Sequence, residues 1–187
     1  MVGKTQVYTG SGKGKTTAAL GLAFRAMGHG LKVYVIQFLK GGTYIGEYIK
    51  SRRMRNIKIK QFGKPCPYSD LMKMGKAECG NCRECFITAE EDKDKAEEAV
   101  KHTKKILSGK KYDLIILDEV NVAVKKGLIS AKSVLDLIKT KPPEVELVLT
   151  GRGAPKSIID AADIVTEMKA IKHPERRGLA GRRGIEY

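Results

Sequence analysis

The sequence lacks tryptophan and contains only four cysteines and four phenylalanines among 187 residues. It also has no apolar stretch near the roughly 18 uncharged residues of a membrane span. The nearest approach to a signal peptide, residues 13–27, is interrupted by Arg25. A chain of this length can bury a full core without disulfide or metal cross-links. We therefore expect a cytoplasmic protein that does not cross a membrane.

Acidic residues and side-chain amides are also scarce. Lys and Arg number 36 against 21 Asp and Glu, which gives a formal net charge of +15. A basic surface attracts nucleic acid or any other polyanion, including a triphosphate. The combination of abundant lysine and few amides is equally typical of thermophile proteins. Charge alone does not choose among these interpretations.

Short apolar segments alternate with helix-like segments, which predicts an α/β fold with a mainly parallel sheet. The segment 15–29 is apolar on nearly every side and is predicted to be a buried helix, whereas 88–108 is predicted to be a charged, solvent-facing helix. We expect one domain over residues 1–187, in which an insert at about 63–87 and a basic tail at about 169–187 depart from the βα alternation. The predicted strands are 4–8, 32–38, 57–62, 114–117, 146–150 and 164–168, and further helices are expected at 130–139 and after Pro155.

A glycine-rich loop separates the first predicted strand from the first predicted helix. Its second half, Gly14-Lys15-Thr16, matches the phosphate-binding pattern G-x-x-x-x-G-K-[ST], whereas Thr9 stands at the position of the first glycine. In such a loop, backbone N–H groups and the helix N-terminus surround phosphate oxygens, the lysine adds charge, and the hydroxyl can bind Mg²⁺. We predict a nucleotide phosphate site formed by Gly10, Ser11, Gly12, Lys13, Gly14, Lys15, Thr16 and Thr17.

Two carboxylates follow the continuous apolar strand 114–117. Asp118 and Glu119 lie at its carboxyl end, where open parallel sheets bind ligands. Either could hold Mg²⁺, as the acidic residue of the second nucleotide motif does, while Asp118 could instead cap the next helix. Arg152 follows the strand 146–150 and would lie at the same edge. These residues predict a Mg-nucleoside triphosphate site, but they leave hydrolysis, phosphoryl transfer and ATP-driven motion open.

Further sequence runs are spread over the whole chain. They comprise residues 7–23, 25–30, 37–41, 46–47, 117–119, 150–152, 162–163, 165–168, 172–174 and 184–187. With these runs the chain resembles the P-loop type of ATP:corrinoid adenosyltransferase, and Thr9 with Gly12-Lys13-Gly14 is that family's own form of the loop. The resemblance implies a three-layer, RecA-like P-loop NTPase fold.

The activity that this resemblance implies is transfer of the 5′-deoxyadenosyl group of ATP to the cobalt(I) of a corrinoid. The products are a cobalt–carbon bond and triphosphate, and the reaction serves adenosylcobalamin biosynthesis or salvage. Cobalt(I) is itself a very strong nucleophile, so the protein needs no nucleophile or general base. Its work is positioning and electrostatic stabilisation of the leaving group.

The family pattern implies roles for the nucleotide-site residues. Lys15 and the loop amides hold the triphosphate, and Lys13 and Arg152 add positive charge. Thr16 and Glu119 bind the Mg²⁺ that accompanies ATP, so Mg-ATP is a substrate. Lys15 and Glu119 are thus the main catalytic candidates.

Other features of the family concern the corrinoid. Gln37, Phe38 and Lys40 lie around the end of the second predicted strand, where they either border the corrinoid or are ordinary strand-end residues. Family members commonly place an aromatic pair after the third strand, thought to displace the lower cobalt ligand so that cobalt(II) is easier to reduce. Phe62 and Tyr68 are the local aromatic candidates, and Phe62 is included among the predicted catalytic residues.

The resemblance also implies partners and assembly. It suggests a homodimer and a flavoprotein reductant that supplies electrons to the corrinoid. Members commonly have an N-terminal extension that helps cover the corrinoid, whereas this sequence begins directly on the first strand. We expect that cover to come from residues 63–85 or from the tail.

All four cysteines lie in one short segment, at Cys66, Cys79, Cys82 and Cys85. This spacing suits four thiolates that converge on one tetrahedral metal. Structural Zn²⁺ is the first interpretation, and an iron–sulfur cluster or reduced, unliganded thiols are the others. Disulfides have little use in a cytosolic chain.

Two other functions compete with adenosyl transfer. A RecA-like P-loop ATPase acting on nucleic acid would suit the net charge and the basic tail, although the interleaved aromatic and basic residues of a stacking platform are missing. A small-molecule kinase would need a general base near its acceptor, and the sequence shows none distinctly. We therefore do not expect nucleic acid as a partner.

Overall fold

The computed structural model describes residues 2–79, 87, 90–172 and 181–187. A six-stranded, all-parallel sheet forms its centre, with strand order β3-β2-β4-β5-β1-β6. This confirms the predicted α/β class. The strands are β1 (Thr5–Thr9), β2 (Val33–Phe38), β3 (Ile57–Phe62), β4 (Leu114–Asp118), β5 (Glu146–Thr150) and β6 (Ile164–Glu167).

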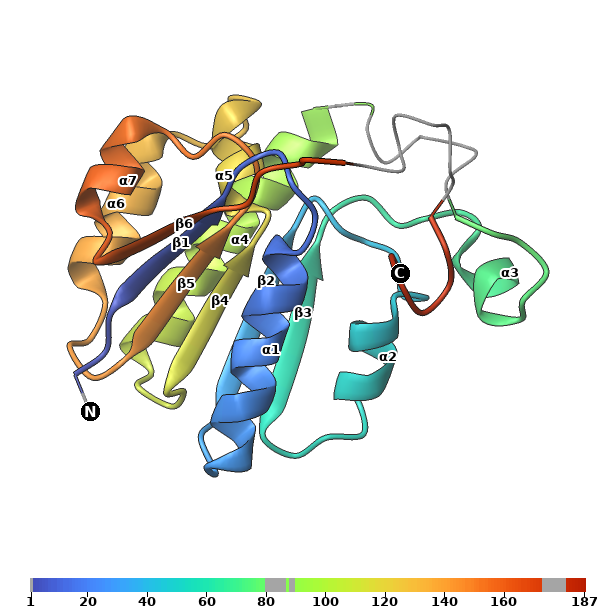
Figure 1. Cartoon of the computed structure of the whole chain (residues 1–187), viewed down its shortest axis with the longest axis horizontal. Coiled ribbons are helices and arrows are strands. Elements are labelled where there is room, and N and C mark those ends of the chain that lie inside the picture. The colour runs from blue at the N-terminus through green and yellow to red at the C-terminus, as the bar shows by residue number, and fades with distance from the viewer. Residues whose placement is uncertain (1, 80–86, 88–89, 173–180) are drawn as a thin grey trace.

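Helices cover both faces of the sheet and give the molecule three layers (Figure 1). One face packs against α1 (Lys15–Gly28), and the other packs against α4 (Glu90–Ser108), whose neighbour is α6 (Ala131–Thr140). β2 and β4 are buried along their whole length because helices lie on both sides of them. The shorter helices are α2 (Gly46–Ser51), α3 (Ser69–Lys73), α5 (Val120–Lys125) and α7 (Lys156–Ala161).

The parallel register brings all strand ends with functional residues to one edge of the sheet. Gln37 of β2 pairs with Asp118 of β4, and Tyr8 of β1 pairs with Thr150 of β5. The loop between β1 and α1 leaves the sheet at the same edge. Thr16 and Asp118, about 100 positions apart in the sequence, are therefore neighbours without a bound ligand.

The packing of α1 differs from the prediction. Burial on nearly every side was expected, yet the ring of Phe24 is 72% exposed. The apolar face on the sheet consists of small side chains, Ala19, Ala23 and Ala26. Short side chains let the helix lie close to the sheet, so the larger apolar residues are left on its flanks. The helix is covered on one side only.

The described parts of the insert and of the tail lie close together. Residues 63–79 contain α3, and residues 181–187 lie beside α2 and α3 (Figure 1). The ring of Tyr187 packs edge-to-face on Tyr44, with 5.4 Å between centroids, and its hydroxyl oxygen accepts a 3.3 Å hydrogen bond from the Cys79 N–H. In the part of the chain that the structure describes, no helix is long and apolar enough to cross a membrane.

Candidate functional site

The glycine-rich loop turns sharply at two glycines. Gly10 has φ of 97° and Gly14 has φ of 114°, backbone conformations that other residues rarely adopt. The Gly12 N–H donates a 2.6 Å hydrogen bond to the Met168 carbonyl, so the residue after β6 supports the loop. Thr9 is the last residue of β1, and its backbone is extended. The position therefore needs no glycine, which explains the departure from the general pattern.

Lys15 lies at the centre of the loop and is only 6% exposed. Its Nζ donates a 2.9 Å hydrogen bond to the Gly10 carbonyl and another to the Gly12 carbonyl. Burial lowers the pKa of Lys15; the negative charge of Glu119 opposes this and the positive charge of Arg152 adds to it. The ammonium group is thus held where phosphate oxygens approach such a loop.

Asp118 organises the polar residues at the sheet edge. Its Oδ1 accepts 2.7 Å hydrogen bonds from the hydroxyls of Thr16 and Thr150. Its Oδ2 accepts bonds from Lys40 Nζ at 2.7 Å and from Gln37 Nε2 at 3.3 Å. The carboxylate is fully buried. Burial alone would raise the pKa of Asp118, but the charge and hydrogen bonds of these neighbours hold it below its usual value.

Lys40 compensates the charge of Asp118. It follows Leu39, a non-glycine residue with φ of 58°, so the chain turns back toward β4 at this point. Its Nζ also lies 3.9 Å from Oε1 of Glu47 on α2. Burial would lower the pKa of Lys40, but Asp118 and Glu47 raise it above its ordinary value. This ion pair joins β4, the end of β2 and α2.

Glu119 is the second acidic residue of the site. Its backbone has φ of 63°, and its N–H donates a 3.0 Å hydrogen bond to the Thr150 hydroxyl. Burial and the nearby charge of Asp118 raise the pKa of Glu119, against the effects of Lys40, Lys15 and Arg152. Both carboxyl oxygens of Asp118 are engaged by protein donors, so Glu119 is the better placed of the two to meet a cation.

The C-terminal residues reach the glycine-rich loop. Lys13 Nζ forms a 2.7 Å ion pair with Oε1 of Glu186, which also binds Arg182 at 3.0 Å. The hydrogen bonds from Arg182 and Lys13 lower the pKa of Glu186 to about 2. Glu186 is therefore ionised throughout the neutral range. Its carboxylate pairs with the ammonium group of Lys13, which we predict to contact triphosphate.

We expect Glu186→Gln to lower the Kd for ATP about two- to fivefold at low salt, the range of an exposed ion pair. The substitution removes the carboxylate that competes with phosphate for Lys13. Calorimetric titration measures the effect, which should shrink with added salt. Glu144→Gln, an exposed change before β5, serves as the control. Weaker ATP binding by Glu186→Gln would instead show that Glu186 holds Lys13 toward the nucleotide.

Not all predicted residues join this cluster. The loop joins the cluster through Thr16, which bonds Asp118, and through Lys15, whose pKa Glu119 and Arg152 affect. Gln37 also bonds Asp118. Phe38 is fully buried in the core instead. The Phe62 ring is 2% exposed and lies 5.3 Å from the His102 ring of α4, so its contact with a corrinoid is not supported. Tyr68, which is 39% exposed, is the more accessible aromatic side chain.

The structure describes only part of the cysteine segment. Cys66 is buried, and Cys79 Sγ lies 3.0 Å from the Tyr44 hydroxyl. Cys82 and Cys85 lie outside the described residues. Within residues 2–79, 87, 90–172 and 181–187, no group of three or more His, Cys, Asp or Glu is arranged to hold a metal ion. The described residues thus give the predicted zinc or iron–sulfur site no support.

Sequence reasoning missed several residues of the site. Thr150 links Asp118 to Glu119. Lys40, for which the sequence left a corrinoid contact or an ordinary strand-end role open, pairs with Asp118. The signal available in the sequence was their position, since Thr150 ends β5 and Lys40 follows the end of β2. Met168 and Glu186 act on the loop from distant parts of the chain, which no local pattern indicates.

This loop, with a buried lysine and acidic residues at the carboxyl edge of a parallel sheet, defines a P-loop nucleotide-binding protein. A solved KaiC-like protein from the hyperthermophilic archaeon Pyrococcus horikoshii OT3 shares this fold. The likeness has a TM-score of 0.51 with 14% identity, and it covers 91% of this chain and 74% of that one.

Sequence comparison assigns the family. A family model described as ATP:corrinoid adenosyltransferase BtuR/CobO/CobP matches residues 2–187. Corrinoid adenosyltransferases of Pseudomonas aeruginosa and Sinorhizobium sp. are 36% and 34% identical over 97% of this chain, and 82% and 78% of theirs. The Escherichia coli K12 corrinoid adenosyltransferase is 34% identical over 97% of this chain and 84% of its own. The chain belongs to this adenosyltransferase family.

Proposed function

We propose that the protein adenosylates a corrinoid with ATP. The cobalt(I) electron pair attacks C5′ of ATP, the cobalt–carbon bond forms, and the bond between C5′ and its oxygen breaks. Triphosphate leaves with that electron pair, and cobalt becomes formally cobalt(III). Family membership and the buried Lys15 in its glycine-rich loop together carry this proposal.

The chain's contribution is to bind the triphosphate and stabilise its growing charge. Lys15 supplies one cation inside the loop, and Lys13 and Arg152 add charge around it. Such preorganised groups stabilise a transition state without reorganising during the reaction. They also aim C5′ away from the phosphates toward the cobalt.

Thr16 and Glu119 suit a Mg²⁺ ion bound with ATP. The Thr16 hydroxyl donates its hydrogen to Asp118, so its oxygen lone pairs remain for a cation. Glu119 adds a carboxylate that is only partly covered, and both are oxygen ligands that Mg²⁺ prefers. When bound, Mg²⁺ neutralises part of the triphosphate charge. Asp118 positions Thr16 rather than acting as the main ligand.

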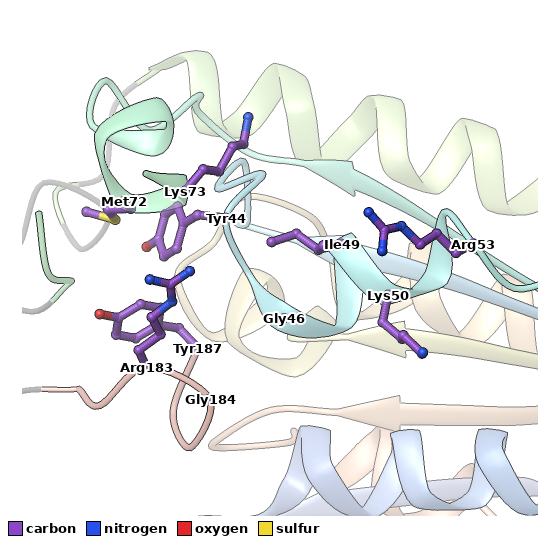
Figure 2. Close-up of a pocket in the computed structure, with 10 residues that line it drawn as sticks. All are labelled: Tyr44, Gly46, Ile49, Lys50, Arg53, Met72, Lys73, Arg183, Gly184 and Tyr187. Atoms are coloured by element: carbon purple, nitrogen blue, oxygen red, sulfur yellow. The ribbon is translucent and has the colours of Figure 1, made fainter. Parts of the chain in front are cut away.

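The corrinoid must lie where its cobalt reaches C5′. Gln37 is buried and bonded to Asp118, and Phe38 is in the core, so neither offers a surface to the corrinoid. The surface formed by α2, α3 and the described C-terminal residues (Figure 2) adjoins the Lys40–Asp118 pair through Glu47 of α2. We place the corrinoid against this surface.

The assay supplies Mg-ATP and chemically reduced cobalamin to the purified protein. The expected result is the absorption spectrum of the cobalt–carbon bond together with one triphosphate per corrinoid. Use of chemically reduced cobalt removes the need for a partner reductant. Formation of ADP without a cobalt–carbon bond would contradict the proposal.

Assembly and partners complete the proposal. We propose one domain over residues 1–187, acting in the cytoplasm as a homodimer, with a flavoprotein that reduces the corrinoid. The charge of +15 supplies electrostatic attraction for anionic partners in general. The nucleic-acid ATPase alternative is not favoured, because the family model and the relatives named above are corrinoid adenosyltransferases.

The metal prediction for Cys66, Cys79, Cys82 and Cys85 depends on sequence spacing alone. Metal analysis of protein purified without chelator tests it, and near-stoichiometric zinc or iron is the expected result. Replacement of Cys79 by serine should then lower the metal content. If both zinc and iron are absent at near-stoichiometric level, the prediction is refuted.

A further inference from the structure

The loop between β5 and α7 carries Arg152 at the same edge of the sheet as the glycine-rich loop. Besides burial, the charge of Arg152 contributes to the lowered pKa of Lys15 and opposes the raised pKa of Glu119. Its guanidinium group therefore lies within electrostatic range of both side chains. Arg152 is exposed, and the backbone on either side of it sets the direction in which its side chain leaves the loop.

Two glycines flank Arg152 and give the loop a backbone that other residues rarely adopt. Gly151 has φ of 131° and Gly153 has φ of 70°. A Cβ atom at Gly151 would lie 3.1 Å from the Cβ of Asn121, so α5 packs directly against this position. The Gly151 N–H donates a 3.1 Å hydrogen bond to the Tyr8 carbonyl. The turn is thus held against both β1 and α5.

Thr9 fixes the far end of this loop. Its Oγ1 accepts a 3.2 Å hydrogen bond from the Ala154 N–H, and the residue is 8% exposed. Its carbonyl is used separately and accepts a 2.9 Å bond from the Met168 N–H. Thr9 stands where the general phosphate-binding pattern has its first glycine, which has no side chain to make such a bond. One side chain therefore joins the glycine-rich loop to the loop that carries Arg152.

Asn121 holds the near end of the loop. Its Nδ2 donates a long, 3.5 Å hydrogen bond to the Gly151 carbonyl. The residue is completely buried, and among the described residues its Oδ1 has no hydrogen-bond partner. A buried amide with an unpaired oxygen is a poor choice for stability alone. Its hydrogen bond to the loop accounts for an amide at this position.

We propose that Thr9 is a positioning residue for Arg152, and that it acts through the Ala154 N–H to aim the guanidinium group at the triphosphate. Asn121 supports the same turn from its other end. A guanidinium group binds phosphate oxygens through donors in a fixed fork, so its direction matters more than that of a point charge. The inference rests on the proposed function only in treating the glycine-rich loop as a triphosphate site.

Calorimetric titration with inorganic triphosphate and Mg²⁺ tests this inference without a corrinoid. Thr9→Val keeps the branching of the side chain but removes the hydroxyl. We expect the Kd for triphosphate to rise about three- to tenfold, the range of one neutral hydrogen bond. Thr9→Ser restores the hydroxyl and should bind triphosphate like the wild-type protein. Thr5→Val, the same change at the other end of β1, is the control and should leave the Kd unchanged.

A double-mutant cycle shows whether Thr9 acts through Arg152. Arg152→Gln alone should raise the Kd at least about tenfold, as loss of a hydrogen bond from a charged group does. In that background Thr9→Val should add less than about twofold, because the group that it positions is gone. The same factor in both backgrounds would overturn the inference. Asn121→Ala should show the same dependence on Arg152, which keeps the inference testable if Thr9→Val does not fold.

Turnover assays with cobalt(I)alamin give a second measurement. Thr9→Val should lower kcat/KM for ATP by a factor similar to the loss of triphosphate binding, while KM for the corrinoid stays at its wild-type value. A mere loss of folded protein would instead lower kcat and leave both KM values unchanged.

The outcomes separate this inference from the proposed function. Unchanged triphosphate binding by Thr9→Val would overturn the inference and leave adenosyl transfer intact. Triphosphate binding without adenosyl transfer would overturn the proposed function alone. A wild-type protein that binds no triphosphate would overturn both.

Discussion

Lys15→Met is expected to reduce kcat/KM for ATP by about 10²- to 10³-fold, as loss of one preorganised charge-stabilising group does. Lys15 is 6% exposed, and its Nζ is fixed between the carbonyls of Gly10 and Gly12. No other ammonium group can take this place, because the loop backbone surrounds it. Steady-state assays with cobalt(I)alamin and direct titration with ATP measure the effect on turnover and on binding.

Two further variants test the specificity of this result. Lys15→Arg keeps the positive charge but replaces the compact ammonium group by a planar guanidinium group, so it should recover little activity. Lys132→Met removes an exposed charge on α6 and should change kcat/KM less than twofold, as surface charges typically have small effects. A reduction of only a few-fold in Lys15→Met would show that the triphosphate is held elsewhere.

Lys40→Met is expected to lower the free energy of unfolding by about 3–5 kcal/mol, because it leaves a buried carboxylate without its partner. The Asp118 side chain is 1% exposed and that of Lys40 is 23% exposed, with 2.7 Å between Oδ2 and Nζ. Activity should fall as well, because Asp118 positions the Thr16 hydroxyl. Urea denaturation at pH 7 measures the stability change.

A double-mutant cycle isolates this ion pair. Asp118→Asn in the Lys40→Met background removes the buried charge, and we expect it to restore part of the lost stability. Asp160→Asn in the same background is the control, since its exposed pair with Lys156 lies on α7. Additive effects of Lys40→Met and Asp118→Asn would show that the two side chains do not interact.

The pH dependence has a defined sign. Because the pKa of Asp118 is lowered in the folded protein, its carboxylate stabilises the fold above the pKa of the unfolded chain, about 3.9. This stabilisation is lost as the pH falls through the pKa of the folded protein. Because the pKa of Lys40 is raised in the folded protein, its ammonium group stabilises the fold below the pKa of the unfolded chain, about 10.4. This stabilisation is lost as the pH rises through the pKa of the folded protein. The stability difference between wild type and Lys40→Met should thus be largest near neutral pH and shrink in acid.

Local sequence patterns predicted most of the fold, because strand-length apolar runs and helical periodicity are themselves local. All six predicted strands lie within one residue of the observed bounds at each end, and β3 and β5 coincide with them. The short helices α2, α3 and α5 were missed, since five or six residues are too few for a helical period to appear. The exposure of Phe24 was also missed, because apolarity on all sides does not reveal which side meets the sheet.

The sequence by itself determined the phosphate loop, the acidic strand end and the family. These features depend on adjacent residues: the glycines that set the turn, the lysine that follows them, and the apolar strand that carries Asp118 to the sheet edge. They could be recognised without coordinates because covalent spacing fixes their geometry.

Only the tertiary structure decided how those residues divide the work. The parallel register places Lys40 and Gln37 against Asp118, which engages that carboxylate and leaves Glu119 for the cation that we propose. The return of the C-terminal residues brings Glu186 to Lys13 and Tyr187 to Tyr44. Such contacts join segments separated by more than 70 residues, as with Lys40 and Asp118. Long-range pairing is settled by the packing of the whole chain, which no local pattern encodes.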